Sequence, residues 1–380
     1  MTFKVYRLGY FRCTYSILMK KYPFLVLALL AASTLYAQVA TPEFDPKTLL
    51  YKGEEKHLSN VRQLTFGGDN AEAYFSFDGK MITYQMRDKA NGKECDQIFS
   101  FNLSGKDTKT TAPQLISTNM GRTTCSYFMP GDSLILYAST HLGNKECPPD
   151  PPKREDHKYV WAIYPDFDIF VADLKGNIKK QLTNTPGYDA EATVSPDGKK
   201  IVFTSLRSGD LELYTMDIDG SNVKQVTNQL GYDGGAFFSP DSKSLIFRSS
   251  RPKTPEEIAE YNSLLKEGLV MPTNMSLYTC KVDGSGLTKI TDLPNASWAP
   301  FFHPSGKKVI FATNFAATHG LPFNLYMIGL DGKNMERITF DSMFDAFPMF
   351  SPDGKHLIFS SNRNNNGTHD TNLFIADWKD

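Results

Sequence analysis

Short runs in which apolar and polar residues alternate cover most of this chain of 380 residues. Residues 200–205 and 356–361 are examples, and both are rich in β-branched and aromatic side chains. Alternation with a period of two is typical of a β-strand that buries one face. The pattern therefore predicts many short strands joined by turns.

The strand pattern occurs six times, each time as four strands with a tight turn between the first and the second. In such a turn proline presets φ, aspartate hydrogen-bonds its own backbone, and glycine adopts the left-handed conformation at the fourth position. The six turns are Ser76-Phe77-Asp78-Gly79, Met129-Pro130-Gly131-Asp132, Ser195-Pro196-Asp197-Gly198, Ser239-Pro240-Asp241-Ser242, His303-Pro304-Ser305-Gly306 and Ser351-Pro352-Asp353-Gly354. We interpret these residues as architectural.

The spacing of the turns indicates the fold class. Their fourth residues stand at 79, 132, 198, 242, 306 and 354, so successive copies are 53, 66, 44, 64 and 48 residues apart. A four-stranded antiparallel unit of about 44 to 50 residues has the size of a propeller blade, and the excess falls between the second and third strands. We therefore predict an all-β fold, a single six-bladed β-propeller over residues 61–380.

The two ends of the repeat region suggest how the ring closes. Residues 61–66 follow the pattern of a fourth strand, and residues 372–378 follow that of a third strand. Pairing them makes a blade of three strands plus one, which removes the open edge of the sheet. We expect this 3+1 blade to lock the propeller.

One insertion, residues 251–273 in blade 4, predicts a short helix. Thr254 and Glu257 fit a capping box, Pro255 suits the first turn, and Gly268 fits the end. Four apolar residues would share one face: Ile258, Tyr261, Leu265 and Leu269. Two interpretations stay open, a helix that covers the groove beside its own blade and a lid or partner-contact helix.

The repeat resembles that of TolB-like six-bladed propellers, relatives of the WD repeat. The likeness rests on the Ser-Pro-Asp-Gly turn, a following Lys-x-apolar-x-Phe strand and a later Asp-x-Asp-Gly-type turn, and it covers residues 61–378. It implies a periplasmic propeller. The family's namesake acts in the Tol-Pal cell-envelope system, binds the lipoprotein Pal and carries an α/β domain before its propeller. Only residues 38–60 precede the first strand here, so we expect an N-terminal extension in place of that domain.

The first 37 residues contain five basic residues and no acidic one. Met19-Lys20-Lys21 precedes an apolar run from Tyr22 to Ala32 and then Leu35-Tyr36-Ala37, which is the plan of a secretory signal peptide. We expect residues 1–37 to be removed, with Met19 as the true start, and no membrane span to remain. The alternative is an uncleaved anchor, since residues 22–41 could span a bilayer.

The charge balance excludes one class of partner. Without the five basic residues of the signal segment, 36 of the 41 basic residues remain against 42 acidic ones, a net charge of −6. A negative chain disfavours nucleic acid as a partner. The sequence also lacks a Gly-x-Ser-x-Gly elbow, which sets aside the prolyl oligopeptidases that carry a propeller beside a hydrolase domain.

The long insertions should all emerge at one end of the propeller, which we call the loop face. They are residues 88–94, 140–166, 251–273, 314–322 and 362–370. Aligning the inner strands on their turns places one slot at the channel mouth, formed by Asn70, Thr123, Asp189, Asp233, Ser297 and Asp345. The slot two residues further holds Glu72, Cys125, Glu191, Gly235, Ala299 and Phe347. We predict an acidic mouth that attracts a basic peptide or a cation such as Ca²⁺; polar groups that only satisfy loop backbones are the alternative.

Aromatic side chains complete the predicted binding surface on the loop face. They are Tyr159, Trp161, Tyr261 and Trp298. Such rings offer contact area at low entropic cost, although a cluster that merely covers the face is the alternative. We expect a monomeric, non-enzymatic, TolB-like propeller in the periplasm that binds a protein or peptide partner of the cell envelope and needs no cofactor.

The cysteines suggest one disulfide. Four remain after removal of the signal segment, too few for a disulfide scaffold in a chain of this size. Cys280 falls in an alternating strand, where we expect a core thiol. Cys95, Cys125 and Cys147 should lie on the loop face, and export favours one bond among them. We favour the pair Cys125 and Cys147.

Histidines on the loop face support an alternative function, a carbohydrate-active (lyase-like or hydrolase-like) or peptide-cleaving enzyme. They are His141, His157, His319 and His369. Their spacing carries no metal signature, so we assign neither a metal site nor a catalytic residue. The run Asp217-x-Asp219-Gly220 resembles the start of a calcium loop, but it lacks the glutamate at the twelfth position and is interpreted as a turn.

Overall fold

The computed structural model of the protein describes residues 42–103, 112–318 and 320–380. Residues 43–380 form one compact unit. The predicted signal segment, residues 1–37, lies outside the described residues. Within the described part of the chain, no helix has the length and apolar character needed to cross a membrane.

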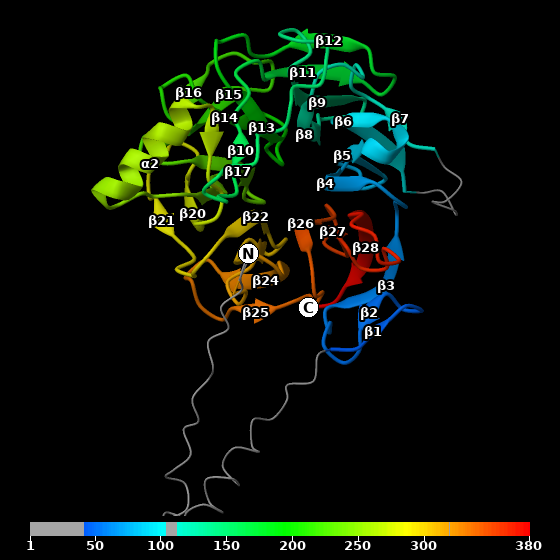
Figure 1. Cartoon of the computed structure of the whole chain (residues 1–380). Helices are drawn as coiled ribbons and strands as arrows, with labels where there is room; N and C mark the ends of the chain where they lie inside the picture. The colour runs from blue at the N-terminus through cyan, green and yellow to red at the C-terminus, as the bar shows by residue number, and fades with distance from the viewer. Residues whose placement is uncertain (1–41, 104–111, 319) are drawn as a thin grey trace, which may run out of the picture. The chain divides into compact units, whose positions relative to one another are not determined.

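Six four-stranded antiparallel sheets make up the described part of this unit. Blade 1 contains β4 (Asp69–Phe75), β5 (Met81–Asp88), β6 (Lys93–Asn102) and β7 (Gln114–Leu115); blade 2 contains β8 (Thr123–Phe128), β9 (Leu134–Ser139), β11 (Asp168–Asp173) and β12 (Ile178–Gln181); blade 3 contains β13 (Asp189–Val194), β14 (Lys200–Ser205), β15 (Glu212–Asp217) and β16 (Lys224–Gln225). Blade 4 contains β17 (Asp233–Phe238), β18 (Ser244–Ser249), β20 (Ser276–Lys281) and β21 (Thr288–Lys289); blade 5 contains β22 (Ser297–Phe302), β23 (Lys308–Thr313), β24 (Asn324–Gly329) and β25 (Glu336–Arg337); blade 6 contains β26 (Asp345–Phe350), β27 (His356–Ser361), β28 (Asn372–Trp378) and β3 (Leu58–Gln63). The inner strands β4, β8, β13, β17, β22 and β26 contact one another in this order and close a ring (Figure 1). The predicted six-bladed propeller is confirmed.

The second strand of each blade contributes one large buried ring at the same position. These rings belong to Tyr84, Tyr137, Phe203, Phe247, Phe311 and Phe359, and all are 0% exposed. They pack in apolar clusters that join neighbouring blades. Burying a side chain of this size stabilises the fold by roughly 1.5–3 kcal/mol, so the six positions hold the blades against one another.

Blade 6 joins strands from both ends of the described chain. Its outer strand β3 pairs antiparallel with β28, with Gln63 opposite Phe374 and Leu58 opposite Trp378. The strand begins three residues before the predicted start at 61, and it continues through an irregularity at Asn60, which has a positive φ of 50° where the register shifts.

Residues 43–57 pack against blade 6 before β3 begins. They contain a small hairpin of β1 (Phe44–Asp45) and β2 (Leu50–Tyr51). Glu55 then forms a buried ion pair with Arg363, 2.9 Å from oxygen to nitrogen, and Arg363 also pairs with Asp345 at 3.1 Å. The extension is thus fastened to the propeller by a shared, fully buried guanidinium.

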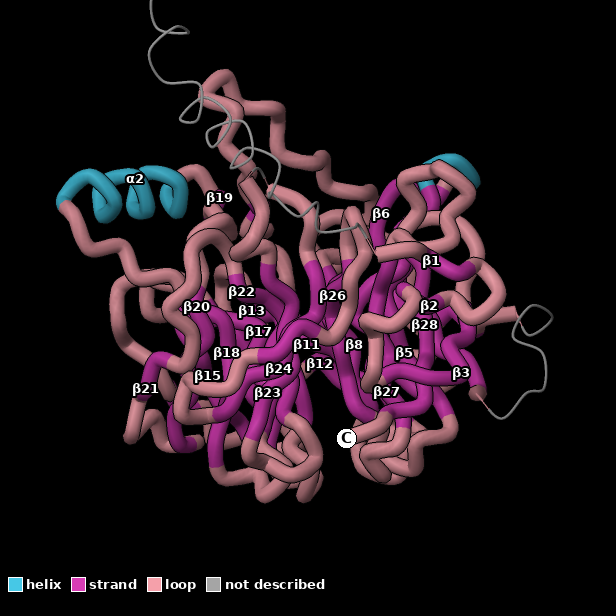
Figure 2. The backbone as a smooth tube through the Cα atoms, turned by 90° about the horizontal axis from the view of Figure 1, so that it is seen from below, coloured by secondary structure: helices cyan, strands magenta, loops and turns pink. Residues whose placement is uncertain are grey.

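The two ends of the propeller differ in shape (Figure 2). One end, the turn face, carries the six tight turns between the first and second strands. The other, the loop face, carries the 3-10 turn η1 (Lys89–Asn91), the helix α2 (Pro255–Lys266) and a two-stranded ribbon of β10 (Trp161–Ala162) and β19 (Leu269–Val270). The predicted helix is confirmed, with both halves of the capping box between Thr254 and Glu257 formed. It buries Tyr261 and Leu264, which favours the covering interpretation.

Candidate binding site in the central channel

A bulge in each inner strand shapes the central channel. In every inner strand, the residue of the second slot has a left-handed φ between 45° and 59°. The register of the strand shifts at this residue. These residues are Glu72, Cys125, Glu191, Gly235, Ala299 and Phe347, and all six line the same small cavity. A bulge re-aims one residue of a strand, and here it directs a side chain from five of the six blades toward the channel, the exception being Gly235 in blade 4.

The predicted acidic mouth is wrong in its charge. Its three aspartates are buried, and each pairs with an arginine eighteen residues later on the same blade. The pairs are Asp189 with Arg207 at 2.8 Å, Asp233 with Arg251 at 2.7 Å, and Asp345 with Arg363 at 3.1 Å. A buried carboxylate needs a compensating charge, so these side chains fasten loops to blades and do not attract a cation. Asn70, in the same slot, is also buried and donates hydrogen bonds to the carbonyls of Gly67 and Thr371.

Glu191 is held by a dense set of donors in the channel. It accepts hydrogen bonds from the hydroxyls of Thr204 and Tyr232, both at 2.7 Å, and from the backbone N–H of Gly235 at 2.9 Å. It also forms an ion pair with Arg248. Burial raises the pKa of Glu191, but Arg248 and the hydrogen bonds outweigh burial and leave the pKa below its ordinary value. Glu191 is therefore an ionised structural group.

Glu72 is the less compensated acid of the channel. Burial raises its pKa to about 7, and the charge of Glu191 acts in the same direction, while a hydrogen bond from the Cys125 thiol lowers it. The cavity beside these groups has a volume of about 30 Å³, room for roughly one or two water molecules. It is too small for a peptide side chain.

The insertions of blades 2 and 4 cover the loop end of the channel. The ring of Trp161 lies 5.4 Å from the Arg248 guanidinium and 5.2 Å from the ring of Trp298. Trp298 is buried, stacks on Phe323 at 4.3 Å and donates its N–H to the carbonyl of Pro272 at 2.9 Å. These two tryptophans therefore pack within the protein.

Of the other two predicted aromatic contacts, one is buried and one is exposed. Tyr261 is buried and donates its hydroxyl hydrogen to Asp210. Tyr159 is 56% exposed and its hydroxyl accepts a hydrogen bond from Trp161 at 3.0 Å. A partner contact at Tyr159 stays a prediction.

The disulfide joins Cys95 to Cys147, so the favoured pair Cys125 and Cys147 is wrong. The bulge turns Cys125 toward the channel axis, where it lines the cavity as a free thiol. The insertion that carries Cys147 instead lies over blade 1, where Asp150 pairs with Lys89 at 3.0 Å. Cys280 is a buried core thiol, as predicted.

The histidines do not gather into a site. His141 is buried against the ring of Phe170, 4.5 Å away, and burial lowers its pKa. His319 lies outside the described residues. Within the described ranges no three side chains of the metal-binding types form a group that could hold an ion.

Four aromatic rings divide the channel at its middle. Tyr74 of blade 1 contacts Tyr127 of blade 2 at 5.6 Å and reaches Phe237 of blade 4 at 5.5 Å. Phe237 in turn contacts Phe301 of blade 5 at 5.2 Å. Blades 1 and 4 are opposite each other in a six-membered ring, so these contacts cross the axis. We call the four rings the aromatic girdle.

A recess opens on the turn face, on the other side of the aromatic girdle. It has a volume of about 320 Å³ and receives residues from all six blades, and we call it the funnel. Its wall is formed mainly by Phe75, Phe77, Tyr127, Pro196, Phe238, Pro240, Phe301, Pro304, Met349 and Pro352. Sequence reasoning missed it, because the turn prolines were interpreted only as turn formers. The signal was the apolar residue at the second position of all six turns, Phe77 or a proline, of which all but Pro130 line the funnel.

Comparisons with known proteins agree with this fold. Residues 163–263 match the family model described as TolB beta propeller domain. A protein described as TolB from Agrobacterium tumefaciens has 21% identity and a TM-score of 0.51, covering 82% of this chain and 91% of its own. TolB from Acinetobacter baumannii has 19% identity and a TM-score of 0.54, covering 80% of this chain and 65% of its own.

An oligogalacturonate lyase from Vibrio parahaemolyticus is similar as well, with 12% identity and a TM-score of 0.50, covering 88% of this chain and 96% of its own. No curated protein matches the sequence. Similarity at these identities shows the fold, a TolB-like six-bladed propeller, and leaves the function to the site.

Proposed function

We propose that this chain is a non-enzymatic binding propeller that holds a protein or peptide partner by an apolar side chain inserted into the funnel. The observation that carries the proposal is the funnel itself, an open apolar recess of about 320 Å³ to which all six blades contribute. Burying a leucine or phenylalanine side chain in such a recess contributes about 1.5–3 kcal/mol to binding. A concave apolar site is the usual form of a recognition pocket.

The residues of the funnel favour binding over chemistry. Its hydroxyls belong to Ser76, Ser351 and Tyr127, and each serine donates its hydrogen to the aspartate of its own turn. No ionisable acid, histidine or lysine is among the described residues that line it. General acid–base or nucleophilic catalysis needs such groups within hydrogen-bond reach of the substrate.

The compartment we propose is the periplasm, with a role in the cell envelope similar to that of the proteins named TolB. The disulfide between Cys95 and Cys147 supports an oxidising compartment. The secretory pattern that ends at Ala37 supports export. Oxidised and reduced peptide maps of protein from a cell-envelope fraction test this; a cytoplasmic, fully reduced protein would contradict it.

The enzymatic alternative gains no support from the placement of its residues. Two of its candidates have structural partners, since His141 packs on Phe170 and Glu191 pairs with Arg248. Among the described candidates on the loop face, Tyr159, His157 and His369 remain exposed. An experiment on binding must therefore distinguish the two faces of the propeller.

Selection from a phage-displayed library of random twelve-residue peptides makes that distinction. We expect the enriched peptides to share a large apolar residue. Phe77→Glu should weaken their binding at least tenfold, the equivalent of about 1.5 kcal/mol. Pro196→Glu, at an exposed position on the blade 3 side of the funnel, should act in the same way without disturbing the core.

Tyr159→Ala is the matched control on the loop face and should leave binding of the selected peptides unchanged. Melting temperatures of all three variants would verify that each is folded. Loss of binding in Tyr159→Ala, with full binding in both funnel variants, would move the site to the loop face and contradict the proposal.

A further inference from the structure

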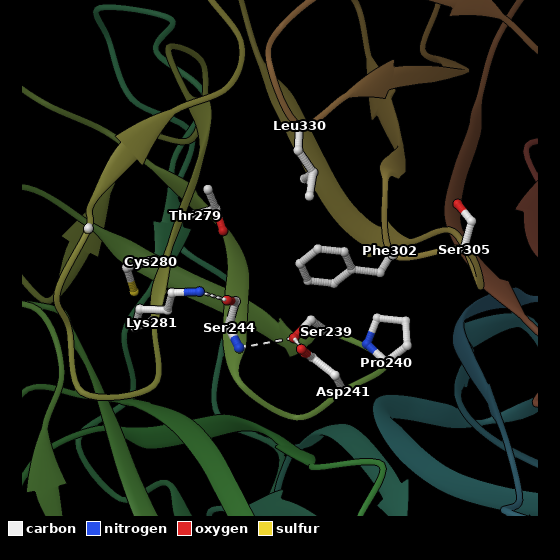
Figure 3. A pocket seen from close by; sticks show the side chains of 12 residues that line it. Ser239, Pro240, Asp241, Ser244, Thr279, Cys280, Lys281, Phe302, Ser305 and Leu330 are labelled. Atoms are coloured by element: carbon white, nitrogen blue, oxygen red, sulfur yellow. Dashed lines mark hydrogen bonds between the residues drawn. The ribbon is translucent and has the colours of Figure 1, made fainter.

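A groove between blades 4 and 5 lies next to the funnel on the turn face, and Figure 3 shows the side chains that line the groove. Its volume is about 440 Å³. Pro240 and Phe302 line both the groove and the funnel, so the two recesses are neighbours on the turn face. An extended ligand that passes these two residues can contact both recesses.

The turns of blades 4 and 5 are farther apart than the neighbouring turns compared with them below. At three other boundaries the fourth residue of a turn packs closely against the proline of the neighbouring turn. A methyl group added at this residue would lie 2.6 Å from the proline for Gly198 and Pro130, 3.0 Å for Gly354 and Pro304, and 3.5 Å for Gly79 and Pro352. At Gly306 the same methyl group would lie 3.9 Å from Pro240.

The two remaining boundaries are tied by hydrogen bonds. The carboxylate of Asp132 accepts from the backbone N–H groups of Phe77 and Asp78, at 2.8 and 2.9 Å. The hydroxyl of Ser242 accepts from the backbone N–H of Asp197 at 3.1 Å. Blades 4 and 5 have no such tie among these turn contacts, which accounts for the open groove.

The walls of the groove differ in polarity. Leu330 and Phe302 form an apolar wall, while Ser244, Thr279 and Lys281 lie on the opposite side (Figure 3). Successive side chains of an extended peptide point in opposite directions. A peptide with alternating apolar and polar residues therefore matches both walls.

The charges around the groove favour an acidic ligand. In blades 1, 3 and 6 the lysine after the turn pairs with the turn aspartate, as Lys80 does with Asp78 at 3.0 Å. In blade 5 the turn aspartate is replaced by Ser305, and Lys307 has no carboxylate within ion-pair distance in the described part of the chain. Lys281 donates a hydrogen bond to the hydroxyl of Ser244 at 3.4 Å; Asp241 and Asp283 act on its charge from beyond ion-pair distance.

The one acid that lines the groove is already occupied. Asp241 accepts hydrogen bonds from the hydroxyl of Ser239 at 2.6 Å and from the backbone N–H of Lys243 at 3.2 Å. These donors lower its pKa and hold its carboxylate against its own turn. The lysines are therefore the groups left to recognise a ligand.

We propose that the groove binds an extended acidic peptide with alternating apolar and acidic side chains, whose terminal large apolar side chain enters the funnel. The proposal rests on the proposed function and adds the direction and charge of the bound segment. Lys281 pairs with an acidic side chain, and Leu330 and Phe302 pack against an apolar one.

Isothermal titration calorimetry with two synthetic peptides tests the proposal. The acidic probe is acetyl-Glu-Leu-Glu-Leu-Glu-Trp-amide, and the basic probe replaces each Glu by Lys. We expect the wild-type protein to prefer the acidic probe. Lys281→Glu should weaken its binding about fivefold, the scale of one exposed ion pair, and should improve binding of the basic probe.

Lys224→Glu is the matched control, because Lys224 is an exposed lysine on the outer strand of blade 3 and changes the net charge equally. It should leave the affinity for the acidic probe within twofold of wild type. Equal effects of both charge reversals, or no preference between the probes, would overturn the groove proposal. In that case loss of binding in Pro196→Glu would still support the funnel, so the two proposals can fail separately.

Discussion

Gly235 is a position where a single added methyl group should disturb a buried ion pair of the channel. Its left-handed φ of 59° is shared by the equivalent residue of every blade, including Ala299 at 46°. What sets Gly235 apart is its neighbour: a β-carbon there would overlap the guanidinium of Arg248, which passes this point to reach Glu191. Gly235→Ala must therefore displace the buried ion pair.

The expected cost follows from two contributions. A non-glycine residue in the left-handed conformation costs roughly 1–2 kcal/mol. Separating a buried ion pair costs about 3–5 kcal/mol, because both charges lose their partner. We expect Gly235→Ala to lower the free energy of unfolding by at least about 3 kcal/mol, whereas Ala299→Gly, at the same slot of blade 5, should change it by no more than about 1 kcal/mol.

Urea unfolding followed by tryptophan fluorescence and circular dichroism measures these values, and Trp161 lies over Arg248 as a local reporter. The decisive comparison is a double-mutant cycle with Arg248→Met. That variant has already lost the ion pair, so adding Gly235→Ala should cost only about 1 kcal/mol of backbone strain. An equal cost of Gly235→Ala in both backgrounds would refute the steric argument.

Three further predictions concern other parts of the propeller. Because the native pKa of Glu72 is about 7, above its ordinary value of 4.5, the folded state binds an extra proton between these pH values, and the stability of the wild type falls as pH rises through that range. The difference in unfolding free energy between Glu72→Gln and wild type, measured by urea titration, should therefore change by about 3 kcal/mol in favour of the variant between pH 4.5 and 7.5. A difference that stays constant over this range would contradict the assignment. Replacing Cys95 and Cys147 together by Ser should lower the unfolding free energy by about 4 kcal/mol, since their bond closes a loop with a sequence separation of 52; an unchanged melting temperature would speak against this. Glu55→Ala should cost about 3 kcal/mol and speed proteolysis before residue 58, because it removes one of two anions from buried Arg363; protease resistance equal to wild type would show that the extension is held by other contacts.

The fold was predictable because each blade repeats its own local signals. The six turns and the alternating strands recur with enough redundancy that the weak copy Met129-Pro130-Gly131-Asp132 is still recognised by its place in the series. The start of the helix was predictable because Thr254, Pro255 and Glu257 form a capping box with a proline in the first turn. Such signals act over a few residues, so the sequence displays them directly.

The site was harder to predict, because its chemistry depends on pairs distant in the chain. The aspartates of the mouth were placed correctly in one slot, but their charge is set by arginines eighteen residues away. Arg248 reaches Glu191 of the neighbouring blade because Gly235 leaves space for its guanidinium and Gly234 leaves space for the Glu191 carboxylate. Likewise the choice of Cys95 over Cys125 depends on the direction in which a strand bulge turns a thiol.

The aromatic girdle closes the central channel, so the propeller is not open from one end to the other. With Tyr74 touching Phe237 across the axis, a molecule seated at one end of the propeller has no passage to the other. The interior is therefore divided into a small cavity with polar groups beneath the tryptophans and the larger apolar funnel on the turn face. A substitution that replaces one of the four rings by a small side chain would therefore open a connection between the two recesses.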